Sequence, residues 1–258
     1  ENFVLISEES DKEWDEQKGK VVIRKFDVQI FPRYHQLDVI RKIRNNVKKE
    51  GVGHNYLIQH TTGSGKSYSI GWLSHTLTSL YQKEGDTKRM FDTILVVTDR
   101  KVLDKQLQNT VSKLEQTGGV VNPVDMGSKQ LKEDLEKGKD IIITTIQKYP
   151  FISKYMSELK GHTFGVVIDE VHSSQTGETS KHLKKSLSLN QEDGIEVDYE
   201  EVIRKEIESR GKQEHISFFG FTGTPKNKTL ELFGRRNEDG HYVPFHSYSM
   251  KQSIQEGF

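Results

Sequence analysis

The chain has 258 residues, of which 33% are hydrophobic and 29% charged, and 38 basic side chains balance 38 acidic ones. This length allows one large α/β domain or two small ones. The lack of cysteine excludes disulfides and thiolate metal sites and fits a reducing cytoplasm, and no apolar run approaches the ~20 residues of a membrane span. Because the net charge is zero, nucleic acid would have to bind to a local basic surface.

Residues 1–30 are predicted to be a charged arm or linker. Residues 1–20 are rich in Glu, Asp and Lys with little periodicity, whereas Val21 to Ile30 has the composition of one strand. The chain begins at Glu1 with neither a methionine nor a signal peptide. We therefore expect a piece of a longer protein, with the arm leading from a further N-terminal domain.

Residues 31–258 alternate between short apolar runs and amphipathic stretches. Leu37, Ile40, Ile43 and Val47 recur at helical spacing, and Gly51 follows as a stop signal. Strands of ~5 apolar residues, each followed by a helical stretch, are typical of a parallel sheet that is covered on both faces. The pattern predicts an α/β three-layer sandwich with a mainly parallel sheet and strands at Tyr56–Gln59, Ile94–Thr98, Ile141–Thr145, Phe164–Asp169 and Ile216–Thr222.

Residues 190–215 interrupt this rhythm with a heavily charged stretch. A charge run of this kind usually forms a solvated surface. We expect a surface insertion that contains one solvated helix.

The strongest local motif is T-T-G-S-G-K-S, which lies between a predicted strand and a predicted helix. Its glycines let the backbone curl so that amides point at phosphate oxygens, and the helix N-terminus adds partial positive charge. Lys66 would contact the β- and γ-phosphates of a nucleotide, and the Ser67 hydroxyl would bind Mg²⁺. His60 stands where the general pattern G-x-x-x-x-G-K-[ST] has its first glycine. The predicted nucleotide-binding residues here are Thr62, Gly63, Ser64, Gly65, Lys66 and Ser67.

Acidic residues end another predicted buried strand, in the run F-G-V-V-I-D-E-V-H. Asp169 can hold Mg²⁺ through its water shell, because Mg²⁺ takes few direct carboxylates. Glu170 follows directly and is placed to orient or deprotonate an attacking water. We therefore predict Lys66, Asp169 and Glu170 as catalytic residues that converge on one Mg-nucleotide pocket at neighbouring strand ends.

The acidic box D-E-x-H resembles the second motif of superfamily-two helicases and translocases, which also tolerate a non-glycine residue at the start of the phosphate loop. The resemblance implies a RecA-like P-loop NTPase lobe that uses ATP and Mg²⁺. Upstream, F-P-R-Y-H-Q is similar to the motif that reads adenine. The similarity implies that Gln36 bonds an edge of the base, with Arg33 or Tyr34 packing nearby.

Three further segments resemble motifs of the same superfamily. F-T-G-T-P resembles the motif that couples nucleotide state to a second lobe, and His172 is placed to bridge it to the acidic pair. V-T-D-R-K-V-L-D-K-Q-L and T-T-I-Q-K are similar to two strand-end motifs that touch the nucleic-acid backbone, contacts that carry no sequence information. The resemblance thus implies coupling by Thr222, Gly223 and Thr224 and backbone contacts by Arg100, Lys101, Thr144, Thr145 and Gln147.

The segments resemble one family more closely than the superfamily as a whole. F-P-R-Y-H-Q-L-D, N-Y-L-I-Q-H-T-T-G-S-G-K-S and V-I-D-E-V-H-S-S-Q-T-G look like the motor (R) subunit of type I restriction-modification enzymes, over roughly residues 31–235. The resemblance implies an ATP-driven motor that pumps double-stranded DNA in the prokaryotic cytoplasm, in a complex with methyltransferase and specificity subunits. It also implies an endonuclease domain before the motor and a second motor lobe after it.

Two parts of such an enzyme have no counterpart in the pattern of this chain. Nothing after Phe233 resembles a second α/β lobe, whose arginine finger is worth ~10³–10⁵ in turnover, so we expect Mg-ATP binding with slow hydrolysis. The letters E-x-K of a nuclease site occur at residues 16–18 without an apolar strand around them, so we expect no nuclease site. The ten histidines show no tight ligand spacing, and magnesium with nucleotide is the only metal expected.

Two alternative functions use the same motifs. One is a helicase that unwinds its nucleic acid, which would have identical lobe chemistry. The other is a nucleotide-gated binding module without turnover, against which Glu170 argues, because a pure switch has little need of a carboxylate that activates water.

Overall fold

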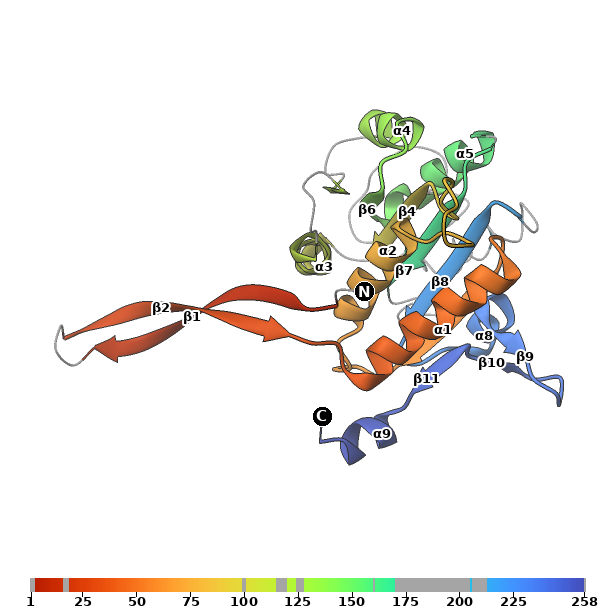
Figure 1. The fold of residues 1–258 in the computed structure, drawn as a ribbon. Helices are drawn as coiled ribbons and strands as arrows, with labels where there is room; N and C mark the ends of the chain where they lie inside the picture. Colours follow the sequence, from red (N-terminus) through yellow and green to blue (C-terminus); the bar gives the residue numbers. More distant parts are fainter. Residues whose placement is uncertain are drawn as a thin grey trace, which may run out of the picture.

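The computed structural model describes residues 3–15, 19–98, 101–114, 120–123, 128–159, 161–169, 205 and 213–257. Its centre is a seven-stranded sheet with the strand order β11-β3-β8-β7-β4-β6-β5, in which every pair of neighbours is parallel (Figure 1). The five predicted strands are all present, and β5 and β11 extend the sheet at its two edges. The strands are β3 (Asn55–His60), β4 (Thr93–Thr98), β5 (Val121–Pro123), β6 (Ile141–Thr145), β7 (Phe164–Ile168), β8 (Ile216–Thr222) and β11 (His246–Tyr248).

Helices cover both faces of the sheet, which confirms the predicted three-layer sandwich. Alternate residues of one strand serve the two cores: in β4, Ile94 and Val96 pack in one core and Leu95 and Val97 in the other. Because both faces are buried, the strands read as continuous apolar runs. The first core includes α1 (Tyr34–Glu50), α2 (Lys66–Thr78) and α3 (Lys101–Lys113), and the second includes α4 (Ser128–Glu136), α5 (Tyr149–Glu158) and α8 (Asn227–Phe233).

Helix α1 follows its predicted pattern except at Leu37, which is half-buried, whereas Val39 lies in the core. Val39, Ile40, Ile43 and Val47 are buried on the face that packs on the sheet. The helix ends at Glu50 and is followed by Gly51, whose positive φ of 86° is one that glycine tolerates. The apolar spacing thus accounts for the buried face of this helix, and the glycine accounts for its end.

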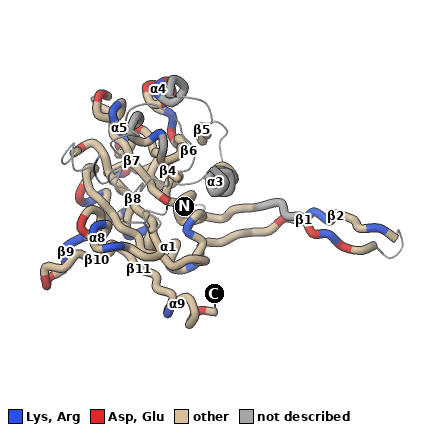
Figure 2. Tube along the Cα trace, turned by 180° about the vertical axis from the view of Figure 1, so that it is seen from behind, with Lys and Arg blue, Asp and Glu red and all other residues tan. Residues whose placement is uncertain are grey.

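The strand expected at residues 21–30 is present in the N-terminal arm, and it pairs with an earlier strand that was not expected. β1 (Leu5–Asp15) pairs antiparallel with β2 (Lys20–Ile30) in continuous register, and the ribbon extends away from the body (Figure 1). Basic and acidic residues are interspersed along it (Figure 2), and Arg24 and Glu13 form a cross-strand ion pair at 2.8 Å. Backbone pairing with β2 stabilises β1 although its side chains are mostly polar.

The C-terminal part returns to the sheet. The short strands β9 (Arg235–Arg236) and β10 (Tyr242–Val243) pair antiparallel, β11 then lies along β3, and α9 (Met250–Gln255) follows. The expected charged insertion at 190–215 lies outside the described residues except for Lys205 and residues 213–215. Within the described ranges, no helix is long and apolar enough to cross a membrane.

Candidate nucleotide site

The phosphate loop has the curled backbone that its glycines predict. The loop spans residues 61–65 between the end of β3 and the start of α2. Gly63 and Gly65 have φ values of 82° and 77°, which residues with a Cβ atom rarely adopt. The Ser64 N–H donates to the Thr61 carbonyl at 3.2 Å. This turn leads into the N-terminus of a 13-residue helix, an arrangement that attracts anions.

Lys66 lies in the first turn of α2 and folds back over the loop. Its Nζ donates to the carbonyl oxygen of His60 at 3.4 Å. Ser67 is half-buried beside it, whereas Thr62 and Gly63 are exposed. The predicted phosphate-binding residues are thus contiguous and partly open to solvent, while their contacts with a nucleotide stay a prediction.

Asp169 follows β7, which is separated from β3 by β8 alone. All three strands are parallel, so the loop after β3 and Asp169 lie at the same edge of the sheet. Strand spacing places the backbones of β3 and β7 about 10 Å apart, a gap that a Mg-triphosphate and the Lys66 side chain can span. The Asp169 N–H donates to the Val97 carbonyl at 2.9 Å. Glu170 and His172 lie outside the described residues.

The segment after β8 contacts the phosphate loop. Thr222 is buried and pairs in register with Gln59 of β3. A Cβ atom on Gly223 would lie 3.5 Å from the His60 carbonyl oxygen and 3.6 Å from the Thr62 Oγ1. The Thr224 N–H donates to the Thr222 Oγ1 at 3.2 Å. The three predicted coupling residues therefore adjoin the loop, while their coupling to a second lobe stays a prediction.

Gln36 is engaged with the loop. Its Oε1 accepts from the Arg33 N–H at 2.8 Å, and its Nε2 donates to the Ser64 carbonyl at 3.2 Å and the Gly65 carbonyl at 3.0 Å. Both amide protons are thus used, and the side chain is buried. Contact with adenine stays a prediction, and the donation of either proton to the base would break one of these bonds. Tyr34, by contrast, is 78% exposed at the start of α1.

The predicted nucleic-acid contacts lie at the ends of β4 and β6. Thr144 and Thr145 pair with Val97 and Thr98 and are only 1% and 9% exposed. The Thr144 hydroxyl would reach a phosphate only after a local rearrangement. Arg100 lies outside the described residues, as do the side chains of Lys101 and Gln147. These five contacts stay predictions.

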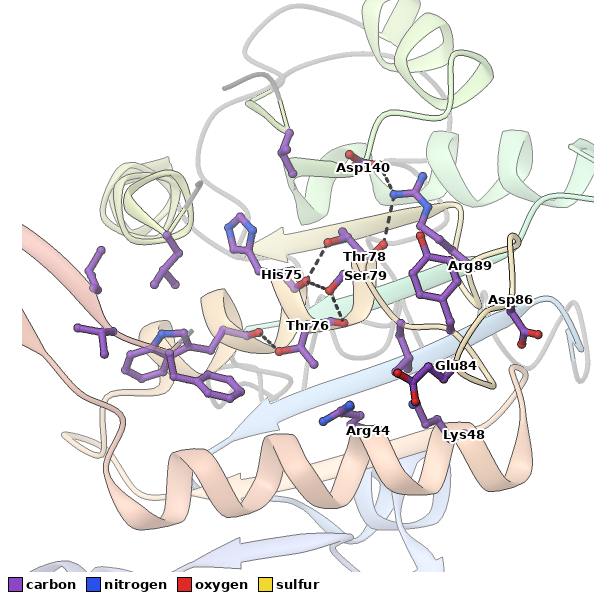
Figure 3. A pocket seen from close by; sticks show the side chains of 18 of the residues that line it. Arg44, Lys48, His75, Thr76, Thr78, Ser79, Glu84, Asp86, Arg89 and Asp140 are labelled. Atoms are coloured by element: carbon purple, nitrogen blue, oxygen red, sulfur yellow. Dashed lines mark hydrogen bonds and ion pairs between the residues drawn. The ribbon is translucent and has the colours of Figure 1, made fainter. Parts of the chain in front are cut away.

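A large hollow of ≈ 1230 Å³ lies at the other end of α2 (Figure 3). The last turns of α2, the start of β1 and the loop after α2 line it, and Arg89 there pairs with Asp140 and donates to the Thr78 carbonyl at 3.2 Å. Because 13 helical residues extend about 20 Å, this hollow is separate from the phosphate loop. Among the described residues, no group of three or more side chains is arranged to bind a metal ion.

Sequence reasoning missed three residues that surround the loop. His35, His246 and Tyr248 come from α1 and β11, and Tyr248 contacts the loop directly: its carbonyl accepts from the Thr61 N–H at 3.1 Å. His35 lies within the motif F-P-R-Y-H-Q, which could have signalled it. β11 consists of three polar residues, so its sequence contains no apolar run that would predict a strand.

Curated proteins similar to this chain are endonuclease subunits of type I restriction enzymes. The endonuclease subunit of a type I restriction enzyme from Staphylococcus aureus strain COL is 25% identical over 223 residues, which cover 80% of this chain and 19% of that protein. The endonuclease subunit of type I restriction enzyme HindI from Haemophilus influenzae is 31% identical over 210 residues, covering 77% and 17%. These relatives confirm the predicted resemblance, although the chain spans less than a fifth of their length.

A solved structure confirms the fold. The type ISP restriction-modification enzyme LlaGI, as a nuclease-deletion mutant in complex with a DNA substrate mimic, matches with a TM-score of 0.53 at 14% identity, covering 87% of this chain and 20% of that one. The RecA-like arrangement of the sheet is therefore shown. The SWI2/SNF2 ATPase family model matches residues 35–195, which is more than half of the chain and includes the phosphate loop and Asp169. The chain belongs to the SWI2/SNF2 ATPase family.

Proposed function

We propose that this chain is the first ATPase lobe of a motor that translocates double-stranded DNA within the endonuclease subunit of a type I restriction enzyme. The observation that carries the proposal is the placement of the phosphate loop and Asp169 at one edge of a parallel sheet, with the segment 222–224 against the loop. The endonuclease-subunit relatives support the restriction assignment. Methyltransferase and specificity subunits as partners, and the prokaryotic cytoplasm as location, belong to the same proposal.

The residues fit a Mg-nucleotide by their chemistry. The curled loop and the start of α2 offer backbone amides to phosphate oxygens, and Lys66 offers a full positive charge. Ser67 and Asp169 carry the hard oxygen ligands that Mg²⁺ prefers and would hold it. Bound Mg²⁺ would neutralise charge that develops on the phosphates, and Glu170 would orient or deprotonate the water that attacks the γ-phosphate.

Nucleotide binding by this chain tests the ATPase part. Titration of a fluorescent ATP analogue with Mg²⁺ should show saturable binding to the parent chain, and Lys66→Ala should weaken it at least about 10-fold, since a buried charge-assisted contact is worth roughly 1.5–3 kcal/mol. Lys49→Ala, on the exposed last turn of α1, should bind like the parent. Equal affinity of Lys66→Ala and the parent would refute the site.

Translocation is tested on the complete subunit in its restriction complex. A double-stranded-DNA motor should displace a triplex-forming strand from duplex DNA in an ATP-dependent manner, whereas an unwinding helicase should separate the duplex strands. Asp169→Asn should abolish the triplex displacement. ATP-dependent strand separation without triplex displacement would replace the proposed motor with the helicase.

A further inference from the structure

Three side chains form a hydrogen-bonded series that begins at His60, the residue directly before the phosphate loop. The Nε2 of His60 lies 2.8 Å from the Nδ1 of His246, and the Nε2 of His246 lies 3.0 Å from the Oδ2 of Asp38. Lys42 pairs with the same Oδ2 at 2.7 Å. His60 is completely buried and His246 is 8% exposed. The series therefore connects the end of β3, the edge strand β11 and helix α1, and it runs from the buried His60 to Asp38, whose side chain is 23% exposed.

The direction of the two hydrogen bonds follows from the donors available. Hydrogen bonds from Lys42 and His246 lower the pKa of Asp38, although burial alone would raise it, so Asp38 is an acceptor. His246 then donates from Nε2 and accepts at Nδ1, and His60 donates from Nε2. Burial lowers the pKa of both histidines, which keeps both rings neutral. Each histidine thus has one defined tautomer.

β11 contacts the loop at a second point, through Tyr248. Besides its backbone bond to Thr61, the Tyr248 ring stacks on the His35 ring at 3.7 Å between centroids. His35 in turn has its Nε2 3.0 Å from the Ser64 carbonyl. The Tyr248 hydroxyl donates to Glu256, just beyond α9, at 2.8 Å. Two independent paths thus connect the C-terminal segment to the loop.

We propose that His60 and His246 are positioning residues of the nucleotide site, and that the series Asp38–His246–His60 fixes the base of the phosphate loop to α1 and β11. The inference rests on the proposed ATPase function. His60 acts through Lys66, because the backbone carbonyl oxygen of His60 accepts a hydrogen bond from the Lys66 ammonium group. The same helix α1 carries Gln36, which bonds to Ser64 and Gly65, so a shift of His60 displaces the loop relative to Gln36 as well as Lys66.

A matched pair of substitutions at His60 tests the hydrogen bond separately from the shape. Gln and Met have similar size, but the Gln amide can donate to the His246 Nδ1 and Met cannot. His60→Met should raise the Kd for a fluorescent Mg-ATP analogue about 10-fold in this chain, because the loop base is no longer fixed and Lys66 loses part of its charge-assisted contact with the phosphates. His60→Gln should stay within about twofold of the parent. His246→Leu should weaken binding like His60→Met, and the double variant should add little, because both interrupt one series.

A stability control separates positioning from folding. Tyr56→Phe removes the bond from the Tyr56 hydroxyl to the Asn46 Oδ1 at 3.0 Å, in the part of β3 remote from the loop. It should lower the melting temperature without changing the Kd for Mg-ATP. All Kd values are measured well below the melting temperature of each variant.

The outcomes are distinct. Binding that is lost in Lys66→Ala but equal in the parent, His60→Met and His60→Gln would overturn the positioning role and leave the proposed function intact. Equal weakening by Met and Gln would also overturn it, since shape rather than the hydrogen bond would then matter. A parent chain that binds no Mg-ATP would overturn both proposals.

Discussion

His60 occupies a position at which a histidine can only be neutral in the folded protein. Burial, reinforced by the neighbouring His246, His35 and Lys66, lowers its pKa from 6.5 to about 2. The unfolded chain keeps a pKa near 6.5, so between pH 6.5 and pH 2 the unfolded state binds more protons than the folded state. Stability linked to this group is therefore present above pH 6.5 and is lost as the pH falls.

This linkage predicts acid sensitivity well above the range of carboxyl titration. Between pH 7 and pH 5, His60 alone should lower the free energy of unfolding by about 2 kcal/mol. His35 and His246, whose pKa values are also lowered by burial, act in the same direction. Urea unfolding at the two pH values measures the difference. In His60→Gln the loss should be smaller by roughly the His60 share, and an unchanged loss would show that another group is responsible.

At the scale of elements, Arg235 connects the short strand β9 to α1 and β3. Its guanidinium group lies 4.9 Å from the centroid of the Tyr56 ring and 4.7 Å from that of Phe245. It also donates to Glu50 at 3.1 and 3.3 Å and to the Asn46 Oδ1 at 2.6 Å. A planar cation that contacts two adjacent rings and also pairs with a bidentate carboxylate uses properties that lysine lacks. This arrangement holds the segment between α8 and β11 against the body.

We therefore expect that Arg235→Lys will not substitute for arginine. Both Arg235→Ala and Arg235→Lys should lower the free energy of unfolding by about 1 kcal/mol, a modest value because the side chain is 31% exposed and solvent screens the ion pair. Arg236→Ala, in the same two-residue strand, should lower it by about 0.5 kcal/mol, the value of an exposed cation–π contact, because its guanidinium group lies 5.0 Å from the centroid of the Tyr242 ring. Chemical unfolding of the three variants measures these free energies. Full stability of Arg235→Lys would show that the planar, bidentate geometry of arginine is not required.

At the scale of the whole molecule, the sequence predicted the parts whose pattern reflects burial. The sheet is buried on both faces at β3, β4, β6, β7 and β8, so these strands read as apolar runs. The glycines of the phosphate loop have positive φ values, which is why the turn requires glycine there. β11 is short and polar, and its place beside β3 depends on backbone pairing between residues far apart in the sequence, with His246 opposite Ile58. Tertiary pairing of this kind leaves no local signal, so the histidine series escaped prediction.

The pairing of β1 with β2 escaped prediction for a related reason, because the described side chains of the two strands are mostly exposed to solvent and β1 therefore has no apolar pattern. Ile6, Val21, Ile23 and Phe26 are 46–65% exposed, and an isolated two-stranded ribbon is marginally stable in water. At its base, however, Leu5 is buried and Phe3 packs against the first core. The ribbon is thus anchored at one end and contributes little to the core.

The two tryptophans of the chain allow this arrangement to be measured. Trp14, near the tip of the hairpin, is 61% exposed, whereas Trp72 of α2 is 3% exposed. Acrylamide should therefore quench only part of the fluorescence, and Trp14→Phe should remove the quenchable part while changing the free energy of unfolding by less than about 0.5 kcal/mol. Trp72→Phe should keep the quenchable part and lower the free energy of unfolding by about 2 kcal/mol, because it leaves a cavity in the first core. A Trp14 that acrylamide does not reach would contradict the exposed hairpin and indicate that its tip is covered.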